Sequence, residues 1–385
     1  MRITKGIIYA NFAPYDNAGN ILDFLVNNFL FVAHFSFQFH NLSNKAPGNI
    51  LTIYKKGVLS YRIPFFNLRV PESFLFLFLP ITGSLFLVQL VWFIFLLRIR
   101  GTKFDYFFSV NALTAWLGNL LKSVGVVKET IYWVWDYYPL EAKSLQEKII
   151  RYLYWYVDTD SAKKSTKTFF LHSRLKQLRI RISGNKYISK KSIIPIGTSS
   201  NLVTIKQKLT PIIGYLGVLK KTQGIEILFE SFPQLLKQYP NLKVEIIGSG
   251  PEEKNLRRKA ATFGDKIKFY GFLESLSEIQ RLMTKWSVGI ATYVPVSDNP
   301  AYFTDPSKIK TYLGAAVPVI STIVTPFSKQ IEKSKAGFVI NYTQEEFVKA
   351  VKEILDSQTK FSKNALMLAG KYDYKKIYKR FFEIK

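Results

Sequence analysis

Short apolar runs alternate with amphipathic stretches along the second half of the chain. The apolar runs have the length of buried strands and cover residues 211–216, 242–248, 267–271 and 288–293. The stretches between them repeat apolar residues at helical spacing and cover 224–238, 252–263 and 276–286. Such regular alternation predicts a parallel, doubly wound α/β sheet that binds ligands at the carboxyl ends of its strands.

The first half shows a similar but less regular pattern. Its candidate strands cover residues 7–12, 49–54, 104–110, 130–135 and 191–197. Candidate helices begin at Gly19 and cover residues 112–123. A polar stretch at 201–210 then separates the halves, so we predict an N-terminal domain over 1–200, a linker over 201–210 and a C-terminal domain over 211–371.

The segment from Asp305 to Ser321, which the pattern predicts as a helix followed by a buried strand, has an unusual charge. Asp305 suits a helix N-cap and Pro306 the first helical position,. Lys308 then places a cation in the first turn, where it opposes the helix dipole. An anion such as a diphosphate on the helix N-terminus would explain this placement. A solvated surface lysine is the alternative.

Composition narrows the possible partners and cofactors. The 385 residues include 54 Lys and Arg against 27 Asp and Glu, a net charge of +27, which favours nucleic acid, anionic lipid or phosphorylated ligands. The absence of cysteine excludes disulfides and thiolate metal sites, and three histidines make a histidine metal cluster improbable,. The basic N-terminus and its short apolar run are interpreted as a first strand rather than a signal peptide.

Residues 74–97 are almost wholly apolar and are followed by Arg98, Arg100 and Lys103. Since about 20 apolar residues suffice to cross a bilayer, this segment is long enough to span one. A single crossing would separate the candidate strands before it from those after it, although they should share one sheet. We therefore predict a helix or re-entrant hairpin in the membrane interface, with Trp92 and the basic group at the headgroups. An unusually apolar core helix is the alternative.

Several turns of the second half resemble those of a known family. The segments are 217–224, 247–252, 269–273 and 306–320. In their order and spacing, residues 212–355 resemble the donor domain of the retaining glycosyltransferases of family 4. The resemblance implies a GT-B fold, in which two facing Rossmann-like domains are joined by a last helix, here 372–385, that crosses back to the first domain.

The chemistry that the resemblance implies is transfer of a sugar from a nucleotide diphosphate sugar with retained anomeric configuration. No metal or other cofactor is expected, and UDP and GDP both remain open. In the family, the leaving diphosphate is stabilised by helix N-termini and basic side chains. The matching donor-binding positions are Gly19, Gly217, Val218, Lys220, Lys221, Gly250, Phe272, Leu273, Ser307, Lys308 and Thr311.

Individual positions have more specific expected roles. The amides of Gly217 and Val218 could cradle phosphate while Lys220 and Lys221 neutralise it, an ordinary surface loop being the alternative. Gly19 lies where the family's first loop approaches the donor. Phe272 and Leu273 occupy the place of the base contact, with simple packing as the alternative.

The carboxylates depart from the family pattern. The positions of the family's Glu-x7-Glu pair are occupied by Phe303 and Thr311, and Thr311 can offer one hydroxyl to a ribose. Asp305 is the nearest carboxylate, and could meet donor-sugar hydroxyls or serve only as a cap. Asp136 follows Trp135, which replaces the usual histidine. Asp136 could orient a sugar or take the acceptor proton, or only cap a turn.

A second acidic motif is discounted. Asp158 and Asp160 resemble the metal-binding Asp-x-Asp of the other glycosyltransferase fold. They lie in a Tyr-rich helical stretch, and three residues make a weak motif. We therefore expect no metal site.

Together these features predict a membrane-associated, metal-independent hexosyl- or other glycosyltransferase at the cytoplasmic face, monotopic or peripheral. The expected partners are a nucleotide-sugar donor, a lipid-linked or polysaccharide acceptor of the cell envelope, and an anionic membrane surface. A non-catalytic, glycosyltransferase-like membrane subunit is the alternative, favoured by the missing acidic pair. No nucleic acid is expected, because nucleic-acid binding would explain neither the apolar segment nor the donor-domain pattern.

Overall fold

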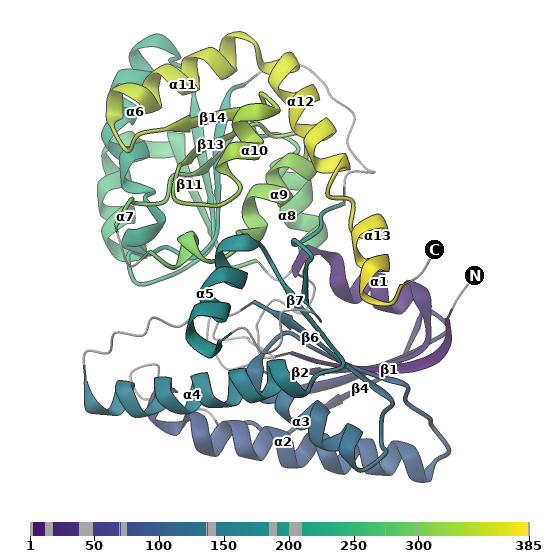
Figure 1. Cartoon of the computed structure of the whole chain (residues 1–385). Coiled ribbons are helices and arrows are strands. Elements are labelled where there is room, and N and C mark those ends of the chain that lie inside the picture. Colours follow the sequence, from purple (N-terminus) through teal and green to yellow (C-terminus); the bar gives the residue numbers. More distant parts are fainter. Residues whose placement is uncertain are drawn as a thin grey trace. The chain divides into compact units, whose positions relative to one another are not determined.

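The structure is a computed structural model that describes residues 3–11, 18–37, 49–68, 70, 75–135, 137, 144–184, 191–199, 210–273, 275–296 and 299–383. The chain divides into two compact units (Figure 1). The first consists of Met1–Pro195 and Tyr378–Lys385, and the second of Ile196–Ile377. Each unit is a Rossmann-like α/β domain, which confirms the predicted fold class.

The first unit contains an eight-stranded sheet in the order β4-β3-β2-β1-β5-β6-β7-β8. The strands are β1 Ile3–Asn11, β2 Phe29–Ser36, β3 Ile50–Lys55, β4 Val58–Pro64, β5 Tyr106–Ser109, β6 Glu129–Val134, β7 Lys167–Phe170 and β8 Lys191–Ile193. Only β3 runs against its neighbours, pairing antiparallel with β2 and β4. The other described pairs in this sheet are parallel.

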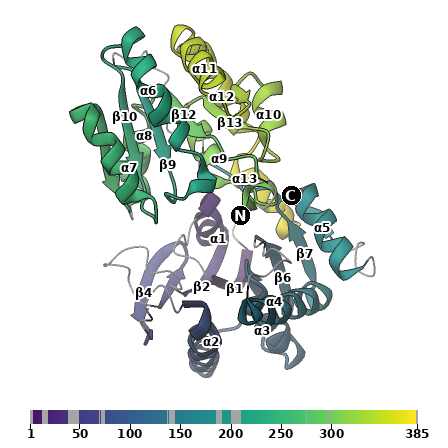
Figure 2. The same cartoon turned by 90° about the vertical axis from the view of Figure 1, so that its left-hand side faces the viewer.

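Helices cover both faces of this sheet (Figures 1 and 2). They are α1 Ile21–Asn28, α2 Leu75–Ile99, α3 Ala112–Ser123, α4 Leu145–Lys164 and α5 Ser173–Ser183. The helices α2, α3 and α4 share one face. There Phe86, Leu90 and Ile94 of α2 pack with Ile8 and Phe35 of the sheet.

The apolar segment does not divide the sheet. Strand β3 precedes α2 and β5 follows it, yet both strands belong to the same sheet. The prediction that these strands share a sheet is therefore confirmed. Residues Pro80–Ile99 are long and apolar enough to cross a membrane, but one side of α2 is buried on the sheet while Val88, Trp92 and Phe95 are exposed.

The C-terminal residues complete the core of the first unit. A 3-10 turn at Tyr378–Phe381 follows α13 Tyr374–Ile377. The hydroxyl of Tyr378 donates a hydrogen bond of 2.8 Å to the carbonyl of Gly19, and its ring lies against Phe24 and Trp133. The end of the chain thus returns to the first unit, as the resemblance implied.

The second unit contains a six-stranded sheet in the order β11-β10-β9-β12-β13-β14, with every pair parallel. The strands are β9 Ile212–Leu216, β10 Lys243–Ile247, β11 Ile267–Gly271, β12 Val288–Ala291, β13 Val319–Thr322 and β14 Gly337–Ile340. The helices are α6 Glu226–Gln238, α7 Glu253–Ala260, α8 Leu276–Met283, α9 Ser307–Gly314, α10 Ser328–Lys333, α11 Gln344–Asp356, α12 Gln358–Gly370 and α13.

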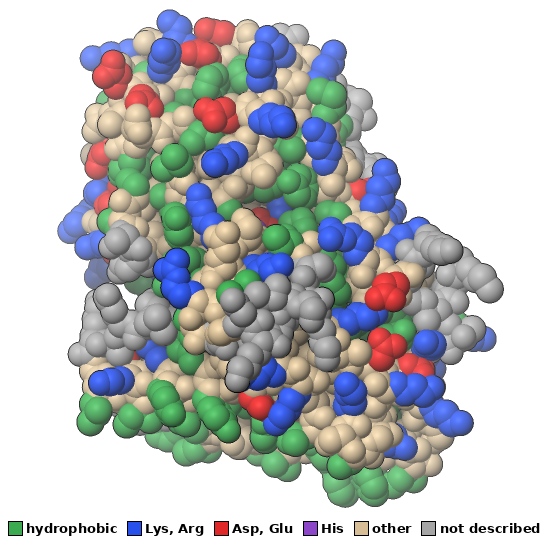
Figure 3. Space-filling view, in the orientation of Figure 1, with side chains coloured by type: hydrophobic (Ala, Val, Ile, Leu, Met, Phe, Trp, Pro, Cys, Tyr) green, Lys and Arg blue, Asp and Glu red, His purple; other side chains and the backbone are tan. Residues whose placement is uncertain are grey.

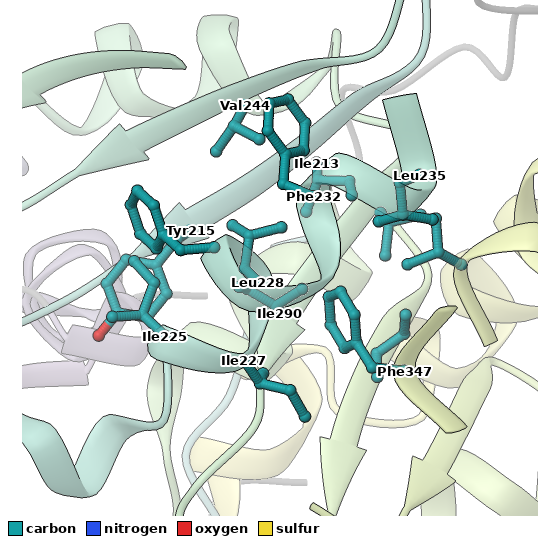
Figure 4. Packing of buried hydrophobic residues seen from close by; sticks show 14 of the residues in the cluster. Ile213, Tyr215, Ile225, Ile227, Leu228, Phe232, Leu235, Val244, Ile290 and Phe347 are labelled. Carbon is teal, nitrogen blue, oxygen red and sulfur yellow. The ribbon is translucent and has the colours of Figure 1, made fainter. Parts of the chain in front are cut away.

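Amphipathic helices close the core of the second unit (Figure 4). Leu228, Phe232 and Leu235 repeat at helical spacing on α6 and are fully buried. They pack in one cluster with Val244 of the sheet and Phe347 of α11. The apolar stripe that predicted these helices from sequence is therefore the stripe that they bury.

Asp158 of the discounted acidic motif is part of a buried polar network in the first unit. Its carboxylate accepts hydrogen bonds of 2.8 Å from the Arg179 guanidinium and 2.7 Å from the Tyr132 hydroxyl. The guanidinium also lies 4.3 Å from the ring centroid of Trp155. Burial, with the Asp158 charge, raises the pKa of Tyr132 well above its usual value. Asp160 instead pairs with Lys164 near the surface, at 2.9 Å, and no cluster of three metal-ligating side chains occurs within the described ranges.

We predict that Asp158→Ala lowers the free energy of unfolding of the first unit by about 3–5 kcal/mol, because it leaves a buried guanidinium without its counter-charge. Five of the six tryptophans lie in this unit, so urea unfolding followed by tryptophan fluorescence reports on it. The matched control on the same helix is Asp160→Ala, which should cost at most about 1 kcal/mol. Equal losses for the two variants would contradict a stabilising role for the buried pair.

Candidate functional site

The candidate site lies at the carboxyl ends of the strands of the second unit. The strand order reverses direction between β9 and β12, which is the position where open α/β sheets bind their ligands,. The loop 217–224 follows β9, the loop 248–252 follows β10, and the segment from Thr292 to Pro306 leads from β12 to α9. The sequence prediction places the donor at these loops and at the start of α9.

Lys308 is the central cation of this site. Its Nζ lies 2.6 Å from Gln223 Oε1 and 3.4 Å from the Tyr215 hydroxyl. It also lies 4.5 Å and 5.1 Å from the ring centroids of Tyr215 and Tyr293. Its partners are thus an amide, a hydroxyl and two rings, and no carboxylate within the described part of the chain pairs with it.

Burial without a counter-charge destabilises the ammonium form of Lys308. The loss of hydration lowers its pKa from the usual value of 10.5 to about 7,. Lysines shifted in this way are concentrated at functional sites. An anion bound beside Nζ would supply the missing charge, so the geometry favours an anionic ligand over a solvated surface lysine.

The start of α9 differs from the sequence prediction. The N-cap is Pro306 and α9 begins at Ser307, so the assignment of Asp305 as the cap was wrong. The buried Asp305 carboxylate accepts a 2.9 Å hydrogen bond from the Ile196 amide and forms an ion pair with Lys310. Contact between Asp305 and a sugar would therefore require this buried ion pair to open.

The glycines of the loops allow a close approach, and one amide of the predicted phosphate cradle is already hydrogen-bonded. The Gly217 amide donates a 2.9 Å hydrogen bond to the Ile247 carbonyl, so this amide is already engaged. Gly217 has a φ of 139°, and a Cβ there would lie 3.1 Å from Lys308 Nζ. A Cβ at Gly250 would lie 2.5 Å from the Leu219 carbonyl oxygen. Gly217 thus makes room for the ammonium, and Gly250 lets the two loops pack together.

The remaining predicted donor residues of this unit lie around the same strand ends. Lys220 and Lys221 are exposed on the β9 loop, and the Val218 carbonyl accepts a 2.8 Å hydrogen bond from Tyr215. Phe272 and Leu273 are half-buried after β11, and Leu273 packs against the core. The Thr311 hydroxyl donates a hydrogen bond of 2.9 Å to the Ser307 carbonyl, one turn earlier in α9.

Two predicted residues belong to the first unit. Gly19 has a φ of 66° and accepts the Tyr378 hydrogen bond through its carbonyl. Asp136 lies outside the described residues, directly after β6 and Trp135.

Sequence reasoning missed the aromatic and amide partners of Lys308. Tyr215 is an inner residue of β9. A tyrosine hydroxyl within an otherwise apolar strand was the only sequence signal for a polar contact there. Gln223 lies at the end of the loop 217–224, where no sequence pattern indicated a contact with Lys308. Tyr293 ends the apolar run of β12, and its hydroxyl is buried with no partner among the described side chains. A buried hydroxyl of this kind is a candidate ligand contact.

Comparisons with known proteins were made by sequence family and by fold. Residues 210–357 match the family model of the glycosyl transferases group 1. The match spans the second unit from β9 to α11. No curated protein matches the chain by sequence.

Solved structures extend the likeness to both units. The chain is 15% identical to a sucrose-phosphate synthase from Thermosynechococcus elongatus, with a TM-score of 0.70 and 98% of each chain covered. It is 14% identical to HepE of Anabaena, solved with UDP-glucose, with a TM-score of 0.65 and 98% of each chain covered. The pneumococcal O-GlcNAc transferase GtfA, solved with UDP and GlcNAc, is 14% identical over 87% of this chain and 63% of its own, with a TM-score of 0.58. At these identities the likeness establishes the GT-B fold.

We predict that Lys308→Ala weakens binding of a nucleotide diphosphate by about 1.5–3 kcal/mol, the usual contribution of a charge-assisted hydrogen bond. Titration calorimetry measures this change. The exposed Lys352→Ala variant on α11, outside the predicted site, controls for the general loss of a positive charge. Unchanged affinity in a folded Lys308→Ala variant would remove Lys308 from the site.

The lowered pKa of Lys308 also predicts a pH dependence. A bound diphosphate stabilises the ammonium and raises its pKa above the value of about 7 in the free protein. Binding then takes up a proton, so affinity for a nucleotide sugar should rise as the pH falls toward 7 and level off below it, with a slope of at most about tenfold per pH unit. In Lys308→Met this slope should disappear. A slope retained in Lys308→Met would assign the proton uptake to another group.

Proposed function

We propose that this protein is a membrane-associated glycosyltransferase that moves a sugar from a nucleotide diphosphate sugar to a lipid-linked or polysaccharide acceptor. The anomeric configuration is retained and no metal ion takes part. The observation that carries the proposal is the half-buried ammonium of Lys308 at the start of α9, which has no carboxylate partner among the described residues. It lies in a domain that matches the glycosyl transferases group 1. The UDP complexes of HepE and GtfA support a nucleotide diphosphate donor, with UDP or GDP as the nucleotide.

In this proposal the protein acts on the leaving group by electrostatics. The bond between the sugar C1 and the diphosphate oxygen breaks, and charge develops on the diphosphate. The Lys308 ammonium and the first amides of α9, beginning at Ser307, stabilise that charge without a metal. The acceptor oxygen bonds to C1 on the same face, and its proton passes to a phosphate oxygen or to Asp136.

The membrane part of the proposal rests on α2. Its exposed side carries Val88, Trp92 and Phe95, and its C-terminal end carries Arg98 and, just beyond, Arg100. Because the opposite side of α2 packs on an undivided sheet, the proposal is a helix lying in the interface at the cytoplasmic face,. An acceptor held in the same membrane would then reach the enzyme by lateral diffusion.

A second candidate function is a non-catalytic subunit that keeps the fold and the membrane surface. Phe303 and Thr311 occupy the positions of the family's acidic pair, and neither can bind sugar hydroxyls as a carboxylate does. Asp305, the nearest carboxylate, is occupied by Lys310. This candidate predicts that no sugar is transferred, whether or not a nucleotide binds.

The test begins with thermal stabilisation by a panel of nucleotide sugars, because a ligand that binds the folded state raises its stability. The best donor is then supplied with a lipid extract, and the anomeric configuration of the product is determined by NMR. We expect transfer with retention, and turnover about a hundredfold or more lower in Asp136→Asn with unchanged donor binding.

The other outcomes separate the alternatives. Stabilisation without transfer to any acceptor would favour the non-catalytic subunit. An inverted product would overturn the proposed stereochemistry. Normal turnover in Asp136→Asn would restrict Asp136 to capping a turn.

A further inference from the structure

Helix α4 presents an apolar stripe outward. The residues of the stripe are Leu145, Ile149, Tyr152, Leu153 and Tyr156, with exposed fractions of 75, 54, 72, 52 and 66%. Their spacing of four, three, one and three residues places them on one face of a helix. An amphipathic helix of a globular domain normally turns such a stripe toward the core, so the orientation of α4 requires an explanation.

The opposite face of α4 fixes this orientation. Ser161 Oγ donates a hydrogen bond of 2.9 Å to the Ala112 carbonyl of α3. Asn119 Nδ2 of α3 donates a hydrogen bond of 3.1 Å to the Ser161 carbonyl. Asp158 holds the buried ion pair with Arg179, and Trp155 is buried beside it. Turning the apolar stripe inward would expose this polar network, so the stripe remains on the surface.

Helix α2 presents a similar stripe on the same side of the first unit. Its outward residues are Ile81, Val88, Trp92, Phe95 and Ile99, which are 56–67% exposed. Between the two helices, Leu120 and Val124 at the end of α3 are 44 and 71% exposed. Figures 1 and 2 place α2, α3 and α4 in one layer, and Figure 3 shows apolar side chains gathered along its outer edge. We call these twelve residues the α2–α4 surface.

The charges around this surface favour an anionic partner. Residues 75–104 contain no Asp or Glu, whereas Arg98, Arg100 and Lys103 follow the α2 stripe and all are exposed. On α4, Lys148 is exposed beside the stripe. A second copy of the chain would bring like charges together across a symmetric contact. A bilayer with anionic headgroups would instead pair with them, and Trp92, Tyr152 and Tyr156 are residue types enriched at headgroup level.

We infer that the whole α2–α4 surface docks on an anionic lipid bilayer, with α4 as a second membrane-binding helix beside α2. This inference rests on the membrane part of the proposed function and adds an element that the apolar content of the sequence does not reveal. Both helices lie along the membrane plane, because each is fixed by its inner face to the same domain.

The test is flotation of the full-length protein with vesicles of phosphatidylcholine containing phosphatidylglycerol. Replacing Ile149, Tyr152 and Tyr156 together by serine should lower vesicle partitioning tenfold or more, since each side chain buries apolar area in the interface. The matched control is Ile323→Ser with Met367→Ser, two equally exposed apolar residues of the second unit, which should leave partitioning unchanged. Thermal unfolding and stabilisation by the nucleotide-sugar donor should match the unmodified protein in both variants.

The outcomes distinguish this inference from the proposed function. Wild-type partitioning of the α4 variant, together with loss of partitioning in Trp92→Ser with Phe95→Ser, would overturn the role of α4 and leave α2 as the membrane element. If the unmodified protein does not bind vesicles, both the role of α4 and the membrane part of the proposed function are overturned. If the α4 variant changes a dimer into a monomer while vesicle binding is unchanged, the α4 stripe is an interface between copies and the inference fails.

Discussion

The candidate site depends on the buried ion pair between Asp305 and Lys310. It joins Asp305, two residues before α9, to Lys310 in the first turn of that helix. Asp305 also accepts a hydrogen bond from the amide of Ile196, where the chain enters the second unit. The Lys310 ammonium lies 5.0 Å from the ring centroid of Phe327 and 4.9 Å from that of Tyr372. The orientation of α9, and hence the direction in which Lys308 points, follows from this pair.

Two lysines of one helix therefore have different electrostatic surroundings. Lys310 is buried with a carboxylate that balances its charge. Lys308 lies between Gln223 and two tyrosine rings, and no carboxylate of the described residues pairs with it. An anionic ligand would add little electrostatic stabilisation to a buried ion pair whose charges already balance. It would add much more to a buried cation that has no counter-charge. The difference separates a residue that holds the site together from one that can bind an anion.

The sequence predicted strands β9 to β13 and helices α6 to α9 of the second unit, because their apolar patterns are regular and the sheet is parallel, but it missed helices α10 and α12. In the first unit it missed β2, β4 and β7. Strand β2 follows α1 without a turn, so its apolar residues extend the helical pattern, and β4 has almost no buried side chain. At the site, the charge argument pointed to Lys308, whose role as an anion ligand stays a prediction. The hydrogen bonds of the Gly217 amide and of Asp305 depend on contacts distant in sequence and could not be predicted.

The return of the C-terminal residues has a consequence for biosynthesis. Phe381 is fully buried, with its ring 5.2 Å from that of Phe108 and 5.0 Å from that of Trp133, so residues near position 380 fill a hole in a domain made largely from the first 195. During translation the first domain emerges from the ribosome with this aromatic pocket open. The pocket cannot be filled until the second domain and the C-terminal residues have been synthesised. Until then its apolar surface is accessible to chaperones.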